Sequence, residues 1–572
     1  MDIQNFNLSQ HISINQNITN EQLAKSAIAP IEQVLPWSNW SGNLSFQFDN
    51  KDQNYYFIPT QFNQLQAIIN QANQLRLEGK KISIRVSGQR HSVSPLVIDQ
   101  KINQNPDIKT WIIDLSLYAD LGENAQQQIK LNPDHTVTVN AGATEEQLDI
   151  FLTNHNLMLK TVTAGGFFSI GGMVAVDVHG SAVNQSIFSQ NVIAFTILNA
   201  NGEKITFSKD SGNFDKFNLM QYYRTSLGAL GIITSVTLAT NERPYKTTLK
   251  PSWHYRSIAN KQKFINTFNN LIISGDYDSV ESFFNPYKFP GVGYGFLTLE
   301  WKIDKNPTFK KKNDVENIPS NQDHIKNRQW GAPYLGDTME KWAENYIQGV
   351  QNGGFWLNGQ TAITSAFTLS IEPQMTHTMT YHKSMWLTKA PRAMFMSYFI
   401  ALPENEYHGL DVAWDALQIL TKTLNDSSDF ILSAPAEFRF VKASDALLSG
   451  TYSENPNQRF ISIEVVGFTQ KTSSDKYPQN LLNFFAKIEK QWIDMKGFPH
   501  LGKMYGFYNP EQSSNNISDI KGISPFNQNY MKLFKQRRNT YINTFANYQK
   551  QVDPNGLFCN QFLTDLGVCY DK

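Results

Sequence analysis

The sequence predicts an α+β protein with two domains, and three observations carry this prediction. The chain has 572 residues, which exceeds the size at which a single hydrophobic core usually stops growing. Hydrophobic residues make up 41% of it and aromatic residues 13%, so apolar surface suffices for more than one core. Segments with the alternation of strands stand next to segments with helical spacing. We expect a first α+β unit and a second domain in which helices flank an antiparallel sheet.

Changes in amino-acid composition along the chain predict where the domain boundaries lie. Residues 1–45 are polar and rich in Asn and Gln, and they end in "LPWSNWSG", whose tryptophans we expect to dock on a domain. After Arg243-Pro244 the segments are longer and more aromatic, with a lysine-rich break at 302–330 that we expect to be an exposed insertion. The predicted segments are an N-terminal arm (1–45), a first domain (46–243), a second domain (244–505) and a C-terminal segment that returns to the first domain (506–572).

The elements of the first domain are predicted in chain order. "IPTQFNQLQAIINQANQLRLEGKK" has apolar residues at helical spacing, and Gly79 ends this helix before the strand "KISIRVSG". "TVTVNAGATEEQLDIFLTNHNLML" predicts a strand, a turn at Gly142, a helix beginning near Glu145 and another apolar segment. "NVIAFTILNANGEKITF" predicts a hairpin with "NANG" as its turn, and "SLGALGIITSVTLAT" predicts a closing strand. Near the C-terminus, one helix is expected to end at Asp553-Pro554.

Charge and composition argue against several classes of partner. Fifty basic residues offset fifty acidic ones, so no long-range field would gather nucleic acid. We find no signal peptide and no run of about 18 apolar residues, so we expect no transmembrane segment. Cys559 and Cys569 are the two cysteines; we expect no disulfide framework and a reducing, cytoplasmic location, while their pairing stays open. A monomer or weak oligomer is expected.

The most informative string is "TAGGFFSIGGMVAVDVHGSA", residues 163–182, which lies between two strand-like stretches. Closely spaced glycines let backbone N–H groups approach a ligand such as a pyrophosphate without interference from Cβ atoms. The dinucleotide fingerprint G-x-G-x-x-G is missing, so a nicotinamide-binding unit is not supported. A glycine-rich turn between strands remains the alternative.

Five segments in this order resemble the PCMH-type FAD-binding domain of the vanillyl-alcohol-oxidase-like flavoproteins over about 190 residues. They are "IPTQFNQLQAII", "IRVSGQRHSVSPL", "VNAGATEEQLDIFL", "SIGGMVAVDVHGS" and "SLGALGIITSVTL". The resemblance implies a two-lobed domain in which the second and fourth segments surround the pyrophosphate of FAD. The cofactor residues that it implies are Ser87, Gly88, Gln89, Arg90, His91, Ser92, Ser169, Gly172, His179 and Ile233.

His91 stands where several members of this superfamily carry a histidine bonded to the 8α-methyl carbon of the flavin. A neutral imidazole is a competent nucleophile near pH 7, and a tether would retain the cofactor and tune it. The resemblance therefore implies covalent FAD through His91, and the alternative is a histidine that only hydrogen-bonds FAD. His179 competes for the same role, but the family pattern makes it a packing or phosphate-side residue.

The second domain resembles, more narrowly, the covalent-flavin cholesterol oxidases, with the aldonolactone oxidases as more distant relatives. In "SAPAEFRFVKASD" the period of two puts Glu437 and Arg439 on one face of a strand. The resemblance places both above the flavin, where the glutamate takes a hydroxyl proton and the arginine stabilises developing negative charge. An ion pair at the surface is the alternative.

Three further residues complete the predicted catalytic set. Glu464 interrupts the apolar strand "RFISIEVVGF", so it should face a polar cavity. Cholesterol oxidases carry an amide at that place, which puts sterol specificity in doubt and makes Glu464 a second candidate base. Lys503 in "GFPHLGKMYGFYNP" matches a lysine near the flavin N1 edge, with an exposed loop lysine as the alternative. Glu281 aligns loosely with a glutamate that gates the sterol oxidases.

These residues predict an FAD-dependent alcohol oxidase. Hydride would pass from the carbinol carbon to flavin N5, and O₂ would reoxidise the flavin to give H₂O₂. The aromatic second domain favours a bulky, apolar secondary alcohol such as a sterol; an aldonolactone or polyol oxidase or dehydrogenase is the alternative, and a flavin-bearing binding protein without turnover is another. We expect no metal, because His377 and His382 in "HTMTYH" have neither helical nor strand spacing.

Overall fold

The computed structural model shows a mixed α+β fold, which confirms the predicted fold class. It describes residues 35–163, 166–243, 252–275, 277–289, 291–301, 375–377, 382–384, 393–427, 432, 434–468, 477–511 and 525–570. Most of the predicted arm, the junction after Arg243 and the predicted insertion at 302–330 lie outside these ranges. The predicted domain boundaries therefore stay predictions.

The first part of the chain forms a small parallel sheet, and one helix packs against this sheet. Its strand order is β3 (Tyr55–Phe57), β5 (Ile108–Ile113) and β4 (Lys81–Val86), and α2 (Phe62–Leu77) connects β3 to β4. The helix buries Leu65, Ile68 and Ile69 against this sheet, and Gly79 at a φ of +84° permits the turn that follows. The predicted strand, helix, strand unit is confirmed.

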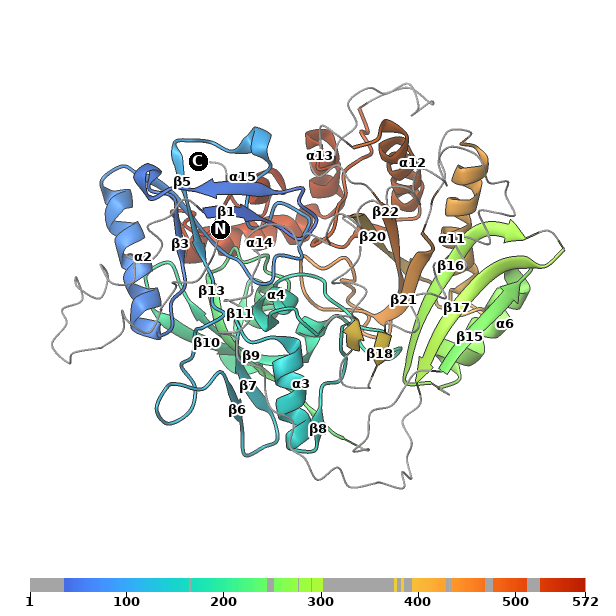
Figure 1. Ribbon diagram of the computed structural model, residues 1–572, viewed down its shortest axis with the longest axis horizontal. Coiled ribbons are helices and arrows are strands. Elements are labelled where there is room, and N and C mark those ends of the chain that lie inside the picture. The colour runs from blue at the N-terminus through green and yellow to red at the C-terminus, as the bar shows by residue number, and fades with distance from the viewer. Residues whose placement is uncertain are drawn as a thin grey trace.

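A five-stranded antiparallel sheet follows, in the order β10, β9, β13, β7, β6 (Figure 1). Its strands are β6 (Ile129–Leu131), β7 (Val137–Asn140), β9 (Val192–Leu198), β10 (Lys204–Ser208) and β13 (Ile232–Leu238). Leu198 pairs with Lys204 across the predicted "NANG" turn, so the predicted hairpin is confirmed. The helix α3 (Glu145–Asn154) begins as predicted, with a capping box between Thr144 and Gln147.

The sequence left open that the glycine-rich string is a turn between two strands. The described residues of this string do not form such a turn. Residues Ile170–Ala175 form the short helix α4. The helix lies against β7 and its following turn so closely that a Cβ on Gly171 would lie 2.8 Å from the Cβ of Ala141. Gly171 therefore allows the helix α4 to pack closely against the neighbouring strand, and the local sequence does not predict this contact.

Smaller elements complete this part of the chain. They are the hairpin β1 (Leu35–Ser38) and β2 (Ser45–Phe48), the pair β8 (Leu157–Met158) and β14 (Asn241–Glu242), the pair β11 (Asn213–Phe214) and β12 (Phe217–Asn218), the helix α5 (Leu219–Tyr223), and the short helical turns η2 (Asn50–Asp52), η3 (Lys101–Asn103), η4 (Phe188–Asn191) and η5 (Lys209–Ser211).

The second large sheet is antiparallel, with seven strands in the order β15, β17, β16, β21, β22, β20, β23. The strands are β15 (Ser252–Ile258), β16 (Ser279–Phe289), β17 (Gly293–Trp301), β20 (Ala393–Leu402), β21 (Ala436–Lys442), β22 (Arg459–Phe468) and β23 (Phe498–Pro499). A separate small hairpin is formed by β18 (Met375–His377) and β19 (His382–Ser384).

One face of the seven-stranded sheet is covered by helices. These are α6 (Lys261–Phe268) with its π-helical continuation η6 (Asn269–Ile273), α11 (Leu410–Asn425) and α12 (Gln479–Asp494), which Figure 1 shows on the outer side of the sheet. Phe264 and Phe268 of α6 pack on Phe438 of β21. Because side chains alternate along a strand, Glu437 and Arg439 point to the opposite face, toward the first part of the chain.

The stretch that was predicted as one helix ending at Asp553-Pro554 forms two helices. The helix α13 (Gln528–Arg537) is followed by α14 (Asn539–Val552), with a break at Arg538. The Arg538 guanidinium lies 4.0 Å from the ring centroid of Phe498 and donates a hydrogen bond of 2.9 Å to the carbonyl of Ser449. These tertiary contacts account for the break, since neither glycine nor proline occurs there.

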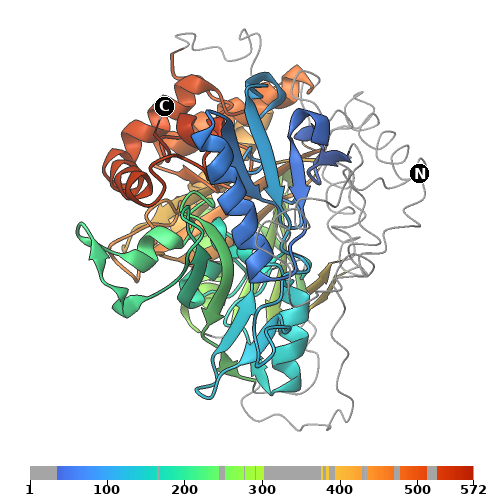
Figure 2. The same cartoon turned by 90° about the vertical axis from the view of Figure 1, so that its left-hand side faces the viewer.

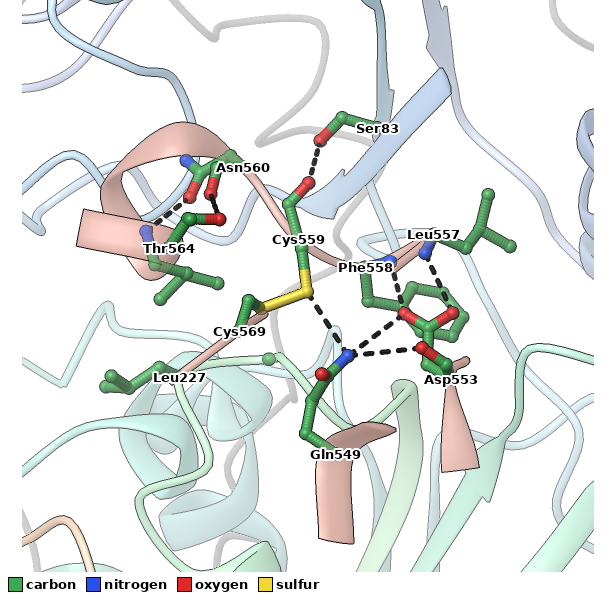
Figure 3. The surroundings of a disulfide bond; sticks show 12 residues. Ser83, Leu227, Gln549, Asp553, Leu557, Phe558, Cys559, Asn560, Thr564 and Cys569 are labelled. Atoms are coloured by element: carbon green, nitrogen blue, oxygen red, sulfur yellow. Dashed lines mark hydrogen bonds between the residues drawn. A yellow bond between two sulfur atoms is a disulfide. The ribbon is translucent and has the colours of Figure 1, made fainter. Parts of the chain in front are cut away.

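The end of the chain packs on the parallel sheet, as Figure 2 shows for the red C-terminal helices beside the blue strands. The N–H of Ile84 donates to the carbonyl of Leu557 over 2.8 Å, and the Ser83 hydroxyl donates to that of Cys559 over 2.7 Å. Cys559 and Cys569 form a disulfide around the last helix, α15 (Gln561–Asp565) (Figure 3). None of the helices in the described ranges combines the length and apolarity needed to cross a membrane.

Candidate active site

A cavity of about 290 Å³ lies between the loops of the first part of the chain and the seven-stranded sheet. The ten residues predicted to bind the cofactor all line it: Ser87, Gly88, Gln89, Arg90, His91, Ser92, Ser169, Gly172, His179 and Ile233. Four of the five predicted catalytic residues line it from the other side: Glu437, Arg439, Glu464 and Lys503. The sequence-predicted residues are therefore brought together in one place, with Glu281 as the exception.

The loop of residues 87–92 lines the cavity along its whole length. Its ends are fixed, because Ser87 donates its N–H to Ile113 and Val93 donates to Gly502, over 2.9 and 3.0 Å. Between these ends, the N–H groups of Gly88, Gln89, His91 and Ser92 have no hydrogen-bond acceptor in the described part of the chain. A Cβ on Gly88 would lie only 2.2 Å from the Ser169 hydroxyl. The two loops thus meet so closely that a larger residue at position 88 would displace the Ser169 hydroxyl.

The imidazole of His91 is enclosed by aromatic rings. It stacks on Trp40 with 5.6 Å between centroids, and the rings of Phe167 and Phe168 lie 4.7 and 5.0 Å away. Burial, and then the charges of Lys503 and Arg90, lower the pKa of His91 to about 3. His91 is therefore neutral at physiological pH, as a nucleophile or a hydrogen-bond acceptor must be.

The N-terminal hairpin holds this loop from outside. Trp37 and Trp40 are both buried, so the prediction that these tryptophans dock on a domain is confirmed. Trp37 donates its indole N–H to the Ser87 hydroxyl over 3.3 Å, and the N–H of Trp40 donates to the carbonyl of Arg90 over 2.8 Å. The sequence alone did not predict that Trp40 would contact His91.

His179 lies on the side of the cavity that faces the sheet. Its Nε2 is 3.0 Å from the Ser462 hydroxyl, and its carbonyl accepts a hydrogen bond of 3.5 Å from Arg439. Burial, and then the charge of Arg439, lower the pKa of His179 to about 3. This neutral histidine therefore connects the loop after α4 to the strands that carry the charged residues.

The charged residues of the sheet occupy neighbouring positions on one face. Glu437 of β21 pairs in register with Glu464 of β22, and Arg439 pairs with Ser462. Arg439 forms ion pairs with Glu437 and, over 3.2 Å, with Glu281 of β16. The Arg439 side chain is only 10% exposed, so the alternative of a surface ion pair does not hold.

Glu281 lies behind Arg439 and outside the cavity lining. Its side chain is 1% exposed, and burial, partly offset by Arg439, raises its pKa. The loose sequence match suggested a gating residue, but the position supports a different role. Glu281 forms an ion pair with one nitrogen of the Arg439 guanidinium and so holds the arginine in position.

Lys503 pairs with Glu464, with 2.7 Å between Nζ and Oε2. The lysine lies in a turn that is fastened to the first part of the chain at two points. Leu501 donates its N–H to Asp177 over 3.2 Å and accepts from the Ser94 hydroxyl over 2.6 Å. Lys503 is thus held at the cavity, which contradicts the alternative of a free loop lysine.

Sequence reasoning missed several polar residues of the cavity. Ser397 of β20, Ser462 of β22 and His500 line it beside the charged residues. Arg85 lies beneath the cofactor loops and donates to the carbonyls of Leu227, Gly228, Leu96 and Phe558. The signal that pointed to Glu464, a polar residue inside an apolar strand, was also present at Arg85 in "KISIRV" and at Ser397 in "AMFMSYFIAL".

The donors in this cavity fit FAD. In the described part of the chain, the backbone N–H groups of Gly88, Gln89, His91 and Ser92 have no acceptor, and the loop has no carboxylate, which suits a pyrophosphate. Gly88 and Gly172 add no Cβ atoms to the lining of this part of the cavity. A neutral histidine and aromatic rings at one end suit a flavin ring.

Comparisons with known proteins agree with this geometry. Residues 54–208 match the FAD binding domain family, and residues 357–566 match the D-arabinono-1,4-lactone oxidase family. The chain thus joins a segment that matches an FAD binding domain to a later segment that matches the D-arabinono-1,4-lactone oxidase family. The second matched segment includes Glu437, Arg439, Glu464 and Lys503.

Individual relatives are lactone oxidases. The D-arabinono-1,4-lactone oxidase of Candida albicans is 25% identical over 440 residues, which are 74% of this chain and 69% of the relative. The L-gulonolactone oxidase of Scyliorhinus torazame is 21% identical over 542 residues, 91% of this chain and 98% of the relative. The D-arabinono-1,4-lactone oxidase of Yarrowia lipolytica is 31% identical over 191 residues, which are 32% of this chain and 31% of the relative.

Similar solved structures include cholesterol oxidases. The enzyme from B. sterolicum has a TM-score of 0.63 and 17% identity, and the match covers 93% of this chain and 97% of that one. At this identity the likeness shows a shared fold alone. The expected sterol substrate therefore has no support, and the relatives favour the aldonolactone alternative.

Proposed function

We propose that this protein oxidises the hydroxyl-bearing carbon of an aldonolactone, with FAD as the hydride acceptor and O₂ as the final electron acceptor. The named relatives support the lactone, and the FAD-binding domain supports the cofactor. A dehydrogenase that passes its electrons to another acceptor is the closest alternative.

The observation that carries the proposal is the polarity of the cavity wall that faces the cofactor loops. Two carboxylate and cation pairs stand there beside the hydroxyls of Ser397 and Ser462. A lactone of a sugar acid carries several hydroxyls, and each can be matched by such a group. A sterol offers a single hydroxyl and would place mostly apolar surface against these charged and polar groups, which removes water from them without replacing its hydrogen bonds.

Each charged group has a task in this reaction. When bound, FAD supplies the acceptor for the hydride at N5. A carboxylate of the Glu437 and Glu464 pair takes the hydroxyl proton, and Arg439 and Lys503 stabilise the negative charge that develops on the substrate oxygen. Burial of the Arg439 pairs keeps competing water away from that oxygen.

A panel of substrates tests the proposal. Purified protein should be yellow, and an aldono-1,4-lactone with O₂ should yield one H₂O₂ per molecule oxidised. Cholesterol serves as the matched control and should give none. Peroxide from cholesterol and not from any lactone would overturn the substrate assignment. A yellow protein that neither compound reduces anaerobically would support a flavin-bearing binding protein.

We propose further that FAD is attached through His91. Attachment replaces one hydrogen of the 8α-methyl carbon with a ring nitrogen of His91, and the two electrons released pass through the flavin to O₂. The support is the neutral imidazole in an aromatic enclosure at the cavity wall. A band that fluoresces after denaturing electrophoresis in the wild type, and not in His91→Ala, is expected. A dark wild-type band would contradict attachment.

A further inference from the structure

On the sheet side of the cavity, Arg439 and Lys503 stand among three carboxylates, Glu437 and Glu464 in the lining and Glu281 behind it, and the two cations are shared unequally. Arg439 serves both Glu437 and Glu281. Lys503 serves Glu464 alone. If all five groups were ionised, there would be one negative charge in excess. Glu437 and Glu281, which share Arg439, would carry this excess charge.

The register of the sheet brings the competing carboxylates close. Glu437 and Glu464 are direct partners on adjacent strands, and side chains in such positions have Cβ atoms about 4.5–5.5 Å apart. Two like charges at this spacing disfavour each other, so one carboxylate tends to hold a proton. Glu464 has a cation of its own, so the proton belongs to the two carboxylates that share Arg439, and of these two only Glu437 lines the cavity.

The surroundings of Glu437 agree with this assignment. Burial raises its pKa, Arg439 offsets part of the rise, and Glu281 and Glu464 add to it, so that the pKa is about 8. The histidines that line the cavity add no positive charge, because burial lowers the pKa values of His91, His179 and His500. The charged groups facing the pair are thus Arg439, Lys503 and Glu281.

We propose that Glu464 is the base that takes the proton of the substrate hydroxyl and that Glu437 enters the reaction protonated. This inference rests on the proposed oxidation of a hydroxyl. The O–H proton passes to the Glu464 carboxylate, the carbon hydride leaves with both electrons to FAD, and the carbon–oxygen bond becomes a carbonyl. Once Glu464 is neutral, the charge of Lys503 is no longer balanced and can stabilise negative charge at the cavity.

Rates of anaerobic flavin reduction by a lactone, measured from pH 6 to 9.5, test this division of roles. With Glu464 as the base, the wild-type rate should fall as pH rises through about 8, because loss of the Glu437 proton adds negative charge where more is developing. Glu464→Gln should slow reduction by about 10²–10⁴-fold. Glu437→Gln should slow it by about tenfold at most and abolish the fall above pH 8, because an amide mimics the protonated acid.

The opposite pattern would overturn the inference. If Glu437 is the base, the wild-type rate rises through pH 8 and Glu437→Gln suffers the larger loss. The two variants are isosteric controls for each other, and thermal unfolding checks that each is folded.

A second measurement is independent of turnover and separates this inference from the proposed function. Infrared difference spectra of the substrate-free protein should show a protonated carboxyl that titrates near pH 8 and is missing in Glu437→Gln. If that band is instead missing in Glu464→Gln, the inference fails even when lactone oxidation is observed. If the band belongs to Glu437 and no lactone reduces the flavin, the proposed function fails and the protonation assignment stands.

Discussion

The two walls of the cavity are built on different principles. The wall formed by residues 87–92 and 169–172 uses backbone N–H groups, closely packed glycines and a neutral histidine. The wall formed by β21, β22 and the turn at Lys503 uses ion pairs on regular strands. The difference supports our proposal that one wall binds a large anionic cofactor through shape and amide dipoles, while the other holds fixed charges for a single proton and hydride transfer.

The largest effect is expected from Arg439→Ala, on the charged wall. Its removal leaves Glu437 and Glu281 without their shared cation, and breaking a buried pair costs about 3–5 kcal/mol of unfolding free energy. Urea unfolding measures this cost. Lys490→Ala, which breaks the exposed pair with Asp494, is the control and should cost less than about 1 kcal/mol. Equal losses in both variants would contradict the importance of burial at Arg439.

Gly88→Ala should damage the cofactor wall while sparing the charged one. The added Cβ would lie 2.2 Å from the Ser169 hydroxyl, and overpacking of this kind costs about 1–3 kcal/mol. We expect FAD to bind about 10–100-fold more weakly, measured by equilibrium dialysis or by flavin content after purification. Asn124→Ala, at an exposed turn position, is the control. Full flavin content in Gly88→Ala would show that the loops do not meet around FAD.

Trp40→Leu tests the enclosure of His91. Loss of the stacked ring leaves the imidazole freer to rotate and more hydrated, so the fraction of covalently attached flavin should fall several-fold. In-gel flavin fluorescence, normalised to total flavin, measures it. Trp414→Leu removes an equally buried indole on α11, behind the sheet, and should leave the fraction unchanged. A drop in both variants would point to general destabilisation.

The smallest effect concerns His500, where the two walls meet. His500 is 5% exposed and accepts the N–H of Gly502 at Nδ1 over 3.0 Å, and burial lowers its pKa well below the usual value. A histidine with a lowered pKa in the folded state stays neutral there, but below about pH 6.5 it takes up a proton when the protein unfolds. The free energy of unfolding therefore decreases as the pH falls below this value. Unfolding free energies at pH 7 and 5 should decline less in His500→Gln than in the wild type. Parallel declines would contradict a buried neutral His500.

Local patterns predicted much of this fold because the determining forces were local. The helix α2, the hairpin of β9 and β10, and the capped start of α3 follow from spacing, turn residues and capping. The helix α4 and the break at Arg538 were missed, since each depends on contacts with segments far away in the sequence.

The same distinction applies to the candidate site. Glu464 was noticed because a carboxylate in an apolar strand needs a partner, and its partner is Lys503. The position of Glu281 behind Arg439 could not be predicted, because it requires knowing that β16 lies next to β21. The prediction of a sterol did not take these polar groups into account for a similar reason: Ser397, Ser462 and His179 form a polar wall only after the strands and loops are assembled.

Anaerobic titration of the wild type and of Arg439→Ala with an aldono-1,4-lactone tests whether one wall binds FAD while the other performs the reaction. The wild-type flavin should bleach with one equivalent of lactone. Arg439→Ala should retain its yellow colour and its FAD but bleach at least about 10²-fold more slowly. Bleaching of the variant at the wild-type rate, or loss of FAD along with Arg439, would contradict the division between the two walls.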